Sequence, residues 1–215
     1  KGSRGSYYSI KDYCDINPEF GTKADFAHFV ETAHEMGFKV ILDWVANHTS
    51  PDNAWTNNEG WHYRDSLGNL MVQYDWTDIS KLNYDNQDMR AAMKQAMRFW
   101  MDSVGIDGFR CDVAGEVPTD FWNWAMTELQ KQYPHMFTLA ENEDKAQELT
   151  EKAFDMYYGW DLHHLMNNVA QGKSTVNDLL NYFAQADTLR PRAIRMNFTS
   201  NHDENSWNGT EYERM

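Results

Sequence analysis

The stretch GFKVILDWVANH, residues 37–48, begins with a glycine, continues as an apolar run and ends in polar side chains. Its apolar, β-branched part is typical of a strand that is buried on both faces of a parallel sheet. The preceding segment, residues 22–36, has apolar side chains at helical spacing and ends at Gly37, as helices commonly do. A helix that leads directly into a buried strand predicts a parallel α/β fold.

The same alternation continues along the rest of the chain. Helices are expected over residues 86–104, 120–132, 145–153, 162–170 and 174–187, and further strands within residues 106–114, 137–140, 154–160 and 194–198. Residues 51–84 lack a sustained period, and a structureless stretch of this length is usually functional. The sequence contains no glycine-rich phosphate loop of a dinucleotide site. We therefore expect a β/α barrel type of sheet with one long excursion over its face.

Polar clusters fall at the carboxyl ends of the expected strands. They comprise Asp43 with Asn47 and His48, Arg110 with Asp112, Glu141, and His202 with Asp203. In a β/α barrel these strand ends converge on the face where barrel enzymes keep their active sites. The clusters therefore predict one shared site.

Charge and composition narrow the class of partner. The 215 residues include 33 acidic and 19 basic ones, a net charge of −14 that would repel phosphate backbones and anionic lipid, so neither nucleic acid nor a membrane surface is expected. The sequence has no apolar run of about 18 residues, so no membrane segment is expected. Aromatic residues make up 14% of the chain, which suits stacking against sugar rings as well as core packing. Because Lys1 opens the chain without an initiator Met or a signal peptide, we interpret it as a piece of a longer protein.

Several carboxylates around one point need a chemical reason, because burying them without partners is costly. Retaining glycoside hydrolysis supplies one, since it uses a carboxylate nucleophile and a carboxylic acid about 5–5.5 Å apart. Asp112 and Glu141, at neighbouring strand ends, suit these two roles. Arg110 lies two residues before Asp112, on the same strand face, and is expected to keep Asp112 ionised.

Four motifs in order resemble those of the α-amylase clan, glycoside hydrolase family thirteen. They are DWVANH at 43–48, GFRCDVA at 108–114, TLAE at 138–141 and SNHDEN at 200–205. The chain resembles a catalytic-barrel fragment of an α-amylase or neopullulanase-like enzyme, which implies a partial TIM (β/α)8 barrel covering about strands three to seven. Residues 1–215 would belong to one catalytic domain, with residues 50–85 as a short domain-B-like insertion. The first, second and eighth strands and a C-terminal β-sandwich are expected outside this chain.

The resemblance also implies roles for individual residues. Asp112 would be the nucleophile, Glu141 the general acid/base and Asp203 the transition-state stabiliser, which also raises the proton affinity of Glu141. The resemblance further implies a set of substrate-binding or supporting residues, namely Arg110, His48, His202, Asp43 and Asn201. Family members also carry an aromatic platform for the sugar in the loop after the second strand, a residue that the sequence does not identify.

The calcium site of many family members is expected to be lost. The Asn of the first motif is present as Asn47, but Lys81 stands where an acidic ligand would align, and Gly115 and Glu116 replace a common Lys-His pair. An ammonium in place of a carboxylate repels a cation, so no metal cofactor is expected, and the Lys81 ammonium is expected to take the place of the ion.

The resemblance implies hydrolysis of α-1,4-glucans such as starch and malto-oligosaccharides through a covalent glycosyl-enzyme. Ala114 and the short excursion favour α-1,4 over α-1,6 links. A transglycosylase or isomerase would use the same intermediate, and a catalytically inactive relative would act as a binding protein, although such relatives usually lose one of the three carboxylates. Polymer-degrading relatives are often exported, which favours a periplasmic or secreted location. The sequence does not give the oligomeric state.

A metal-binding module built on His163 and His164 has little support from the sequence. Adjacent residues of a helix point to different sides, so the two histidines are expected to cap or decorate a surface, although His163 could touch substrate near the barrel mouth.

Overall fold

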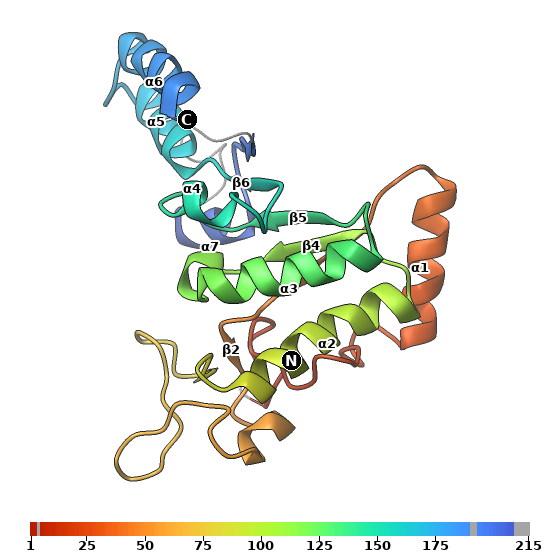
Figure 1. Ribbon diagram of the computed structural model, residues 1–215. Helices are drawn as coiled ribbons and strands as arrows, with labels where there is room; N and C mark the ends of the chain where they lie inside the picture. Colours follow the sequence, from red (N-terminus) through yellow and green to blue (C-terminus); the bar gives the residue numbers. More distant parts are fainter. Residues whose placement is uncertain (4, 190–192, 209–215) are drawn as a thin grey trace.

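Five parallel strands form the main sheet of the computed structural model, which describes residues 1–3, 5–189 and 193–208 (Figure 1). The strands are β1 (Ile41–Trp44), β4 (Gly108–Cys111), β5 (Phe137–Ala140), β6 (Met156–Tyr158) and β7 (Ile194–Met196). They lie side by side in this order, and each neighbouring pair is parallel. The predicted α/β class is therefore confirmed.

Helices connect the strands, as the alternating pattern predicts. They are α1 (Lys23–Glu35), α2 (Gln87–Ser103), α3 (Thr119–Gln132), α4 (Ala146–Leu149), α5 (Trp160–Ala170), α6 (Val176–Leu189) and α7 (His202–Asn208), with short 3-10 turns η1 (Ala54–Asn57) and η2 (Ala114–Glu116). Thr22 and Asp25 form a capping box at the start of α1, in which each side chain accepts a hydrogen bond from the other residue's backbone N–H. Such caps satisfy N–H groups that the first helical turn leaves without helical partners.

Helices α2 and α3 lie against the sheet and supply much of its apolar core (Figure 1). Their fully buried side chains include Met89, Met93, Met97, Phe121 and Trp122, which share one cluster with Phe109 of β4. The close approach of β4 to β5 requires glycine at one position, because a Cβ on Gly108 would lie 1.8 Å from the carbonyl oxygen of Phe137. Glycine at position 108 therefore lets β4 and β5, the strands that precede the predicted catalytic carboxylates, lie close together.

The excursion after β1 is more regular than its sequence indicates. Two short strands, β2 (His48–Thr49) and β3 (Ser80–Lys81), pair antiparallel at its base. Between them the chain forms η1 and isolated bridges, such as that between Arg64 and Leu70, and projects away from the sheet (Figure 1). The excursion therefore returns to the sheet beside the strand end from which it left.

The helix expected over residues 145–153 is wrong in length, because α4 contains only four residues. The chain turns early so that Phe154 packs edge-on against Trp122, with ring centroids 5.2 Å apart. The next residue, Asp155, accepts a hydrogen bond from the backbone N–H of Thr138 on β5 at 2.9 Å. Tertiary packing thus overrides the local helical pattern.

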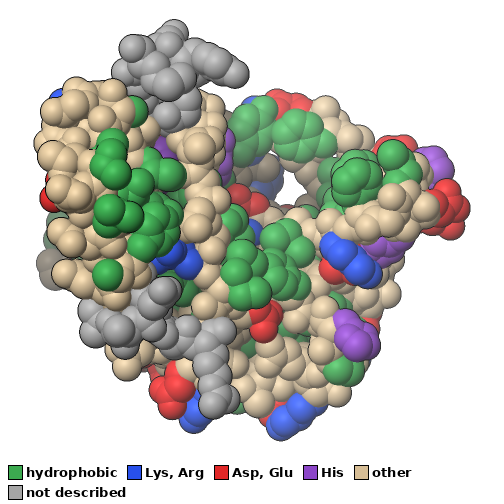
Figure 2. All heavy atoms as spheres, turned by 90° about the horizontal axis from the view of Figure 1, so that it is seen from above, with side chains coloured by type: hydrophobic (Ala, Val, Ile, Leu, Met, Phe, Trp, Pro, Cys, Tyr) green, Lys and Arg blue, Asp and Glu red, His purple; other side chains and the backbone are tan. Residues whose placement is uncertain are grey.

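Strands β1 and β7 are the two outer strands of the main sheet. Beside β1 and α1 lies a mainly apolar groove of about 450 Å³, and two aromatic residues close to it, Phe20 and Phe29, are 69% and 58% exposed. Figure 2 shows apolar side chains at the surface, together with an opening near which acidic and basic side chains lie. We predict that further barrel strands outside this chain cover the two outer strands and the apolar groove. Among the described residues, every helix is too short or too polar to cross a lipid bilayer.

Candidate active site

Strands β4 and β5 bring three charged side chains to one edge of the sheet. Arg110 lies within β4, Asp112 follows β4 directly, and Glu141 follows β5 directly. The backbone N–H of Asp112 donates to the carbonyl of Trp44 on β1, and that of Glu141 donates to the carbonyl of Cys111 on β4, both at 3.0 Å. The hydrogen bonds of the sheet therefore hold the backbone of both carboxylate residues.

One buried guanidinium group, that of Arg110, contacts the carboxylates of the site. Nη1 of Arg110 donates to Oδ1 of Asp112 at 3.0 Å and to Oδ1 of Asp43 at 2.8 Å, while Nη2 forms an ion pair with Oε1 of Glu141 at 2.7 Å. Nε of Arg110 donates to the hydroxyl of Tyr158 at 3.2 Å. Because Asp112 and Glu141 contact the same guanidinium, their carboxyl groups lie close enough to act on one bond, for which glycosidases use separations of about 5 to 9.5 Å.

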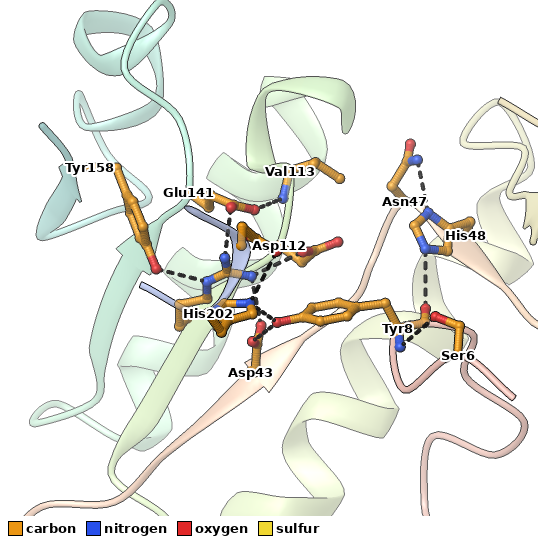
Figure 3. A network of polar contacts seen from close by, with 12 residues as sticks. Ser6, Tyr8, Asp43, Asn47, His48, Asp112, Val113, Glu141, Tyr158 and His202 are labelled. Atoms are coloured by element: carbon orange, nitrogen blue, oxygen red, sulfur yellow. Dashed lines mark hydrogen bonds and ion pairs between the residues drawn. The ribbon is translucent and has the colours of Figure 1, made fainter. Parts of the chain in front are cut away.

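Val113 adopts a left-handed backbone conformation between the two carboxylates. Its φ is 36°, which is unusual and strained for a β-branched residue. This turn directs the Val113 N–H to Oε2 of Glu141, to which it donates at 2.8 Å (Figure 3). The strained residue therefore orients the carboxyl group of Glu141 toward Asp112 and Arg110.

The two carboxyl groups are held in an environment that favours protonation. Burial raises the pKa of Asp112, and the neighbouring Glu141 carboxylate raises it further. Arg110 lowers this pKa, as the sequence predicts, but burial and Glu141 together outweigh its effect. Burial also raises the pKa of Glu141 against Arg110 and the Val113 N–H, with Asp203 adding to the rise. Two carboxyls in one site titrate as a pair, so the pair retains a proton to higher pH than ordinary carboxyls do.

Tyr8 reaches this site from the loop that precedes α1. Its hydroxyl donates to Oδ2 of Asp43 at 2.8 Å and also contacts Nε2 of His202. Its ring stacks on that of His202, with 5.7 Å between centroids and 6° between planes. Tyr8 was missed in the sequence, where the Tyr7–Tyr8 pair within a Gly- and Ser-rich segment was the available signal. Tyr8 lines the same cavity as Asp112 and Glu141.

A cavity of about 480 Å³ opens beside these groups and falls within the usual range for small-molecule sites. Its lining includes Asp112, Glu141 and Asp203 together with the aromatic side chains of Tyr8, Trp76 and Trp160. Trp76 and Trp160 come from the excursion and from the first position of α5. Polar groups that act on a bond and aromatic faces that suit sugar rings therefore meet in one cavity.

His48 also lines the cavity, but both of its ring nitrogens contact protein atoms (Figure 3). Nε2 lies 3.1 Å from the carbonyl oxygen of Tyr8, and Nδ1 lies 3.1 Å from Nδ2 of Asn47. Burial lowers the pKa of His48 to about 4, so the neutral ring donates to Tyr8 and accepts from Asn47. His48 thereby holds the Tyr8 loop in place.

The remaining predicted residues lie at the start of α7. Asp203 lines the cavity, and His202, which stacks on Tyr8, has its Nε2 3.5 Å from Oδ1 of Asp203. Asn201 has a supporting position, because its Oδ1 caps α7 by accepting a hydrogen bond from Glu204 N at 2.8 Å. The structure thus brings strand ends and the start of α7 to one site.

Comparison with known proteins agrees with this arrangement. The family model that describes the α-amylase catalytic domain matches residues 3–60 and 54–211 of the chain. The chain belongs to the α-amylase family. The predicted family is therefore confirmed, and the five-stranded sheet is a segment of a barrel of this family.

Three relatives of the α-amylase family illustrate the similarity. An α-amylase from Lactobacillus plantarum has a crystal structure that matches 99% of this chain and 55% of its own, at 37% identity and a TM-score of 0.87. The maltogenic α-amylase AmyB from Thermotoga neapolitana matches 94% of this chain and 48% of its own, at 35% identity and a TM-score of 0.86. The α-amylase MalA from Haloarcula japonica is 29% identical over 92% of this chain and 31% of its own length. The chain thus spans only a third to about half of these proteins.

The residues at the position where the α-amylase family often binds calcium do not fit that ion. Nδ2 of Asn47 donates to Oε1 of Gln73 at 2.8 Å, and Nε2 of Gln73 donates to Oε2 of Glu116 at 2.7 Å. Lys81 lines the same small cavity as Asn47 and Glu116. Calcium takes six to eight oxygen ligands, whereas here the Gln73 and Glu116 oxygens already accept hydrogen bonds from amide N–H groups, and Lys81 lies beside them.

The position of His163 differs from the surface position that the sequence predicts. His163 is only 1% exposed, so the predicted surface position is wrong, and its ring stacks on Phe198 with 4.7 Å between centroids. The rings of His163 and His164 lie 5.4 Å apart, although they occupy consecutive helical positions. They converge because both rings pack against Trp160, each at 6.0 Å.

Proposed function

We propose that the protein containing this chain hydrolyses α-1,4-linked glucans with retention of anomeric configuration. The observation that carries the proposal is the contact of one buried guanidinium, that of Arg110, with both Asp112 and Glu141 beside an aromatic-lined cavity. Relatives that are named α-amylases support the same class of substrate.

The first chemical step forms a covalent glycosyl-enzyme. The Asp112 carboxylate attacks the anomeric carbon, while Glu141 donates its proton to the glycosidic oxygen. The bond between the anomeric carbon and that oxygen breaks, so a glycosyl ester forms on Asp112 and the rest of the glucan leaves as an alcohol. The raised pKa values of Asp112 and Glu141 belong to one coupled pair that keeps a proton nearer to neutral pH, and this mechanism has that proton on Glu141 and the negative charge on Asp112.

The second step releases the sugar. Glu141, now a carboxylate, takes a proton from a water molecule whose oxygen attacks the anomeric carbon, and the ester bond to Asp112 breaks. Two successive inversions give overall retention. Asp203 at the cavity wall would bind sugar hydroxyls and stabilise the positive charge that develops on the ring in both transition states, while Tyr8 and Trp76 would offer stacking faces.

Product analysis with the full-length protein tests this function. Maltoheptaose, starch, pullulan, cyclodextrin and maltose are incubated separately, and products are followed by thin-layer chromatography and by NMR of the anomeric proton. We expect shorter malto-oligosaccharides that are released first as α-anomers. Longer oligomers or isomers would instead identify a transglycosylase or isomerase, initial β-anomers an inverting enzyme, and glucan binding without products a binding protein.

We also propose that no calcium ion occupies the position beside Asn47. The hydrogen-bonded chain from Asn47 through Gln73 to Glu116, with Lys81 alongside, supports this proposal. We expect added Ca²⁺ to change the melting temperature of the chelator-treated full-length protein by less than about 1 °C, since no site beside Asn47 binds that ion in the folded state. Calcium is measured in parallel in the wild type and in Glu116→Gln. Stoichiometric calcium that the wild type retains and this variant loses would contradict the proposal.

A further inference from the structure

Two histidines and a carboxylate meet where α5 lies beside the start of α7. One ligand atom each from His163, His164 and Glu204 lie within 4.8 Å of one another. We propose that this cluster binds a divalent transition-metal ion of the zinc type. Two imidazoles and one carboxylate are a donor set that suits zinc, with a fourth position left for water. The proposal does not depend on the reaction at Asp112 and Glu141.

The separation of the two inner donors matches that of ligands on one ion. Nε2 of His163 lies 3.3 Å from Oε2 of Glu204. Tetrahedral zinc holds nitrogen and oxygen ligands at about 2.0–2.2 Å, which puts two ligands about 3.3–3.5 Å apart. The exposed His164 offers its ligand atom within 4.8 Å of both, and rotation of its side chain can bring that atom closer.

The hydrogen bonding of His163 also favours a cation at this point. Nδ2 of Asn167 lies 3.1 Å from Nε2 of His163, so the amide N–H can donate to a lone pair on that nitrogen. Oε2 of Glu204 lies 3.3 Å from the same nitrogen, a contact that is favourable when Nε2 carries a proton or when a metal ion takes the place of that proton. A metal ion would take the place of the Asn167 N–H and bind both groups.

The two inner donors are held by rigid elements. The side chain of His163 is 0% exposed and that of Glu204 is 13% exposed. The His163 ring is fixed between Phe198, on which it stacks, and Trp160, which meets it edge-on. Glu204 lies in the first turn of α7, directly after Asp203. A bound ion would therefore tie α5 to the turn that carries Asp203.

Metal titration of the full-length protein tests this site. Chelator-treated protein is titrated with Co²⁺, whose visible absorption reports tetrahedral coordination, and then with Zn²⁺ by calorimetry. The test variants are His164→Ala, which removes an exposed ligand, and Glu204→Gln, which keeps the side-chain shape. The matched control is His28→Ala, since His28 is an exposed histidine of α1. Melting temperatures with and without Zn²⁺ give a second readout.

We expect one ion per chain at this site in the wild type and in His28→Ala, with a higher melting temperature when Zn²⁺ is present. His164→Ala and Glu204→Gln should each weaken binding by about tenfold or more and remove the rise in melting temperature, because each takes away one of three protein ligands. The proposal is overturned if the wild type binds no stoichiometric ion. It is overturned equally if both test variants bind as tightly as the wild type.

Discussion

Replacing Asp112 by asparagine is expected to lower the turnover of α-glucans by roughly 10⁴- to 10⁶-fold, the range seen when a catalytic group that acts directly in bond making is removed. The amide still accepts a hydrogen bond from Arg110, but it cannot form the glycosyl ester. Binding of maltoheptaose should stay within a few-fold of the wild type, because the cavity walls are unchanged. Steady-state kinetics and calorimetric titration of the full-length variant measure the two quantities separately.

The stability of the same variant separates a catalytic role from a folding role. Burial raises the pKa of Asp112, so the wild type gains stability from the protonated group at low pH and loses it as pH rises through the raised pKa. Asp112→Asn does not ionise, so it should melt at the same or a higher temperature than the wild type at about pH 8, with a smaller difference at about pH 4. An exposed control, Asp88→Asn at the start of α2, should keep full turnover. A lower melting temperature together with lost binding would indicate that Asp112 mainly supports folding.

Much of the architecture was predictable because local and long-range signals agree. Thr22 and Gly37 delimit α1 as cap and stop, and residues 137–140 form β5 with the expected bounds. The prediction of a helix over residues 145–153 was wrong in length, because the helical spacing competes with the burial of Phe154 and the hydrogen bonds of Asp155 to β5. The strands of the excursion were not predicted for another reason. Strands β2 and β3 contain two residues each and pair across about 30 positions, so neither has a periodicity that the sequence could show.

The candidate site divides in the same way. Arg110, Asp112 and Glu141 were predictable because strand ends in a parallel sheet share one edge. Tyr8 was not, because it lies in an irregular loop and meets His202 across 194 positions of sequence. The left-handed conformation of Val113 was equally hidden, since a β-branched residue normally avoids it. Contacts that only tertiary structure creates thus account for the residues that the sequence did not reveal.

Replacing Arg110 by glutamine is expected to lower the free energy of unfolding by about 3–5 kcal/mol near neutral pH, the usual cost of leaving buried charges without their partner. The Arg110 side chain is only 7% exposed and contacts Asp43, Asp112 and Glu141. Burial lowers the pKa of Arg110, but Glu141 and Asp43 outweigh burial and raise it, so the guanidinium is permanently charged in the folded state. Glutamine retains hydrogen-bonding groups but supplies no positive charge.

The pH dependence of that loss identifies its cause. Arg110 lowers the pKa of both Asp112 and Glu141, so its removal raises these pKa values further. A carboxyl with a raised pKa stabilises the fold while protonated and loses this contribution as pH rises through the raised value, so the deficit of Arg110→Gln should be large at about pH 8 and small at about pH 4. Thermal unfolding of the full-length variant measures it, and the exposed control Arg98→Gln should unfold close to the wild type at both pH values. An equal loss of unfolding free energy at both pH values would mean that Arg110 contributes packing rather than charge. The double variant Arg110→Gln/Asp112→Asn should recover part of that free energy only if the unpaired carboxylates cause the loss.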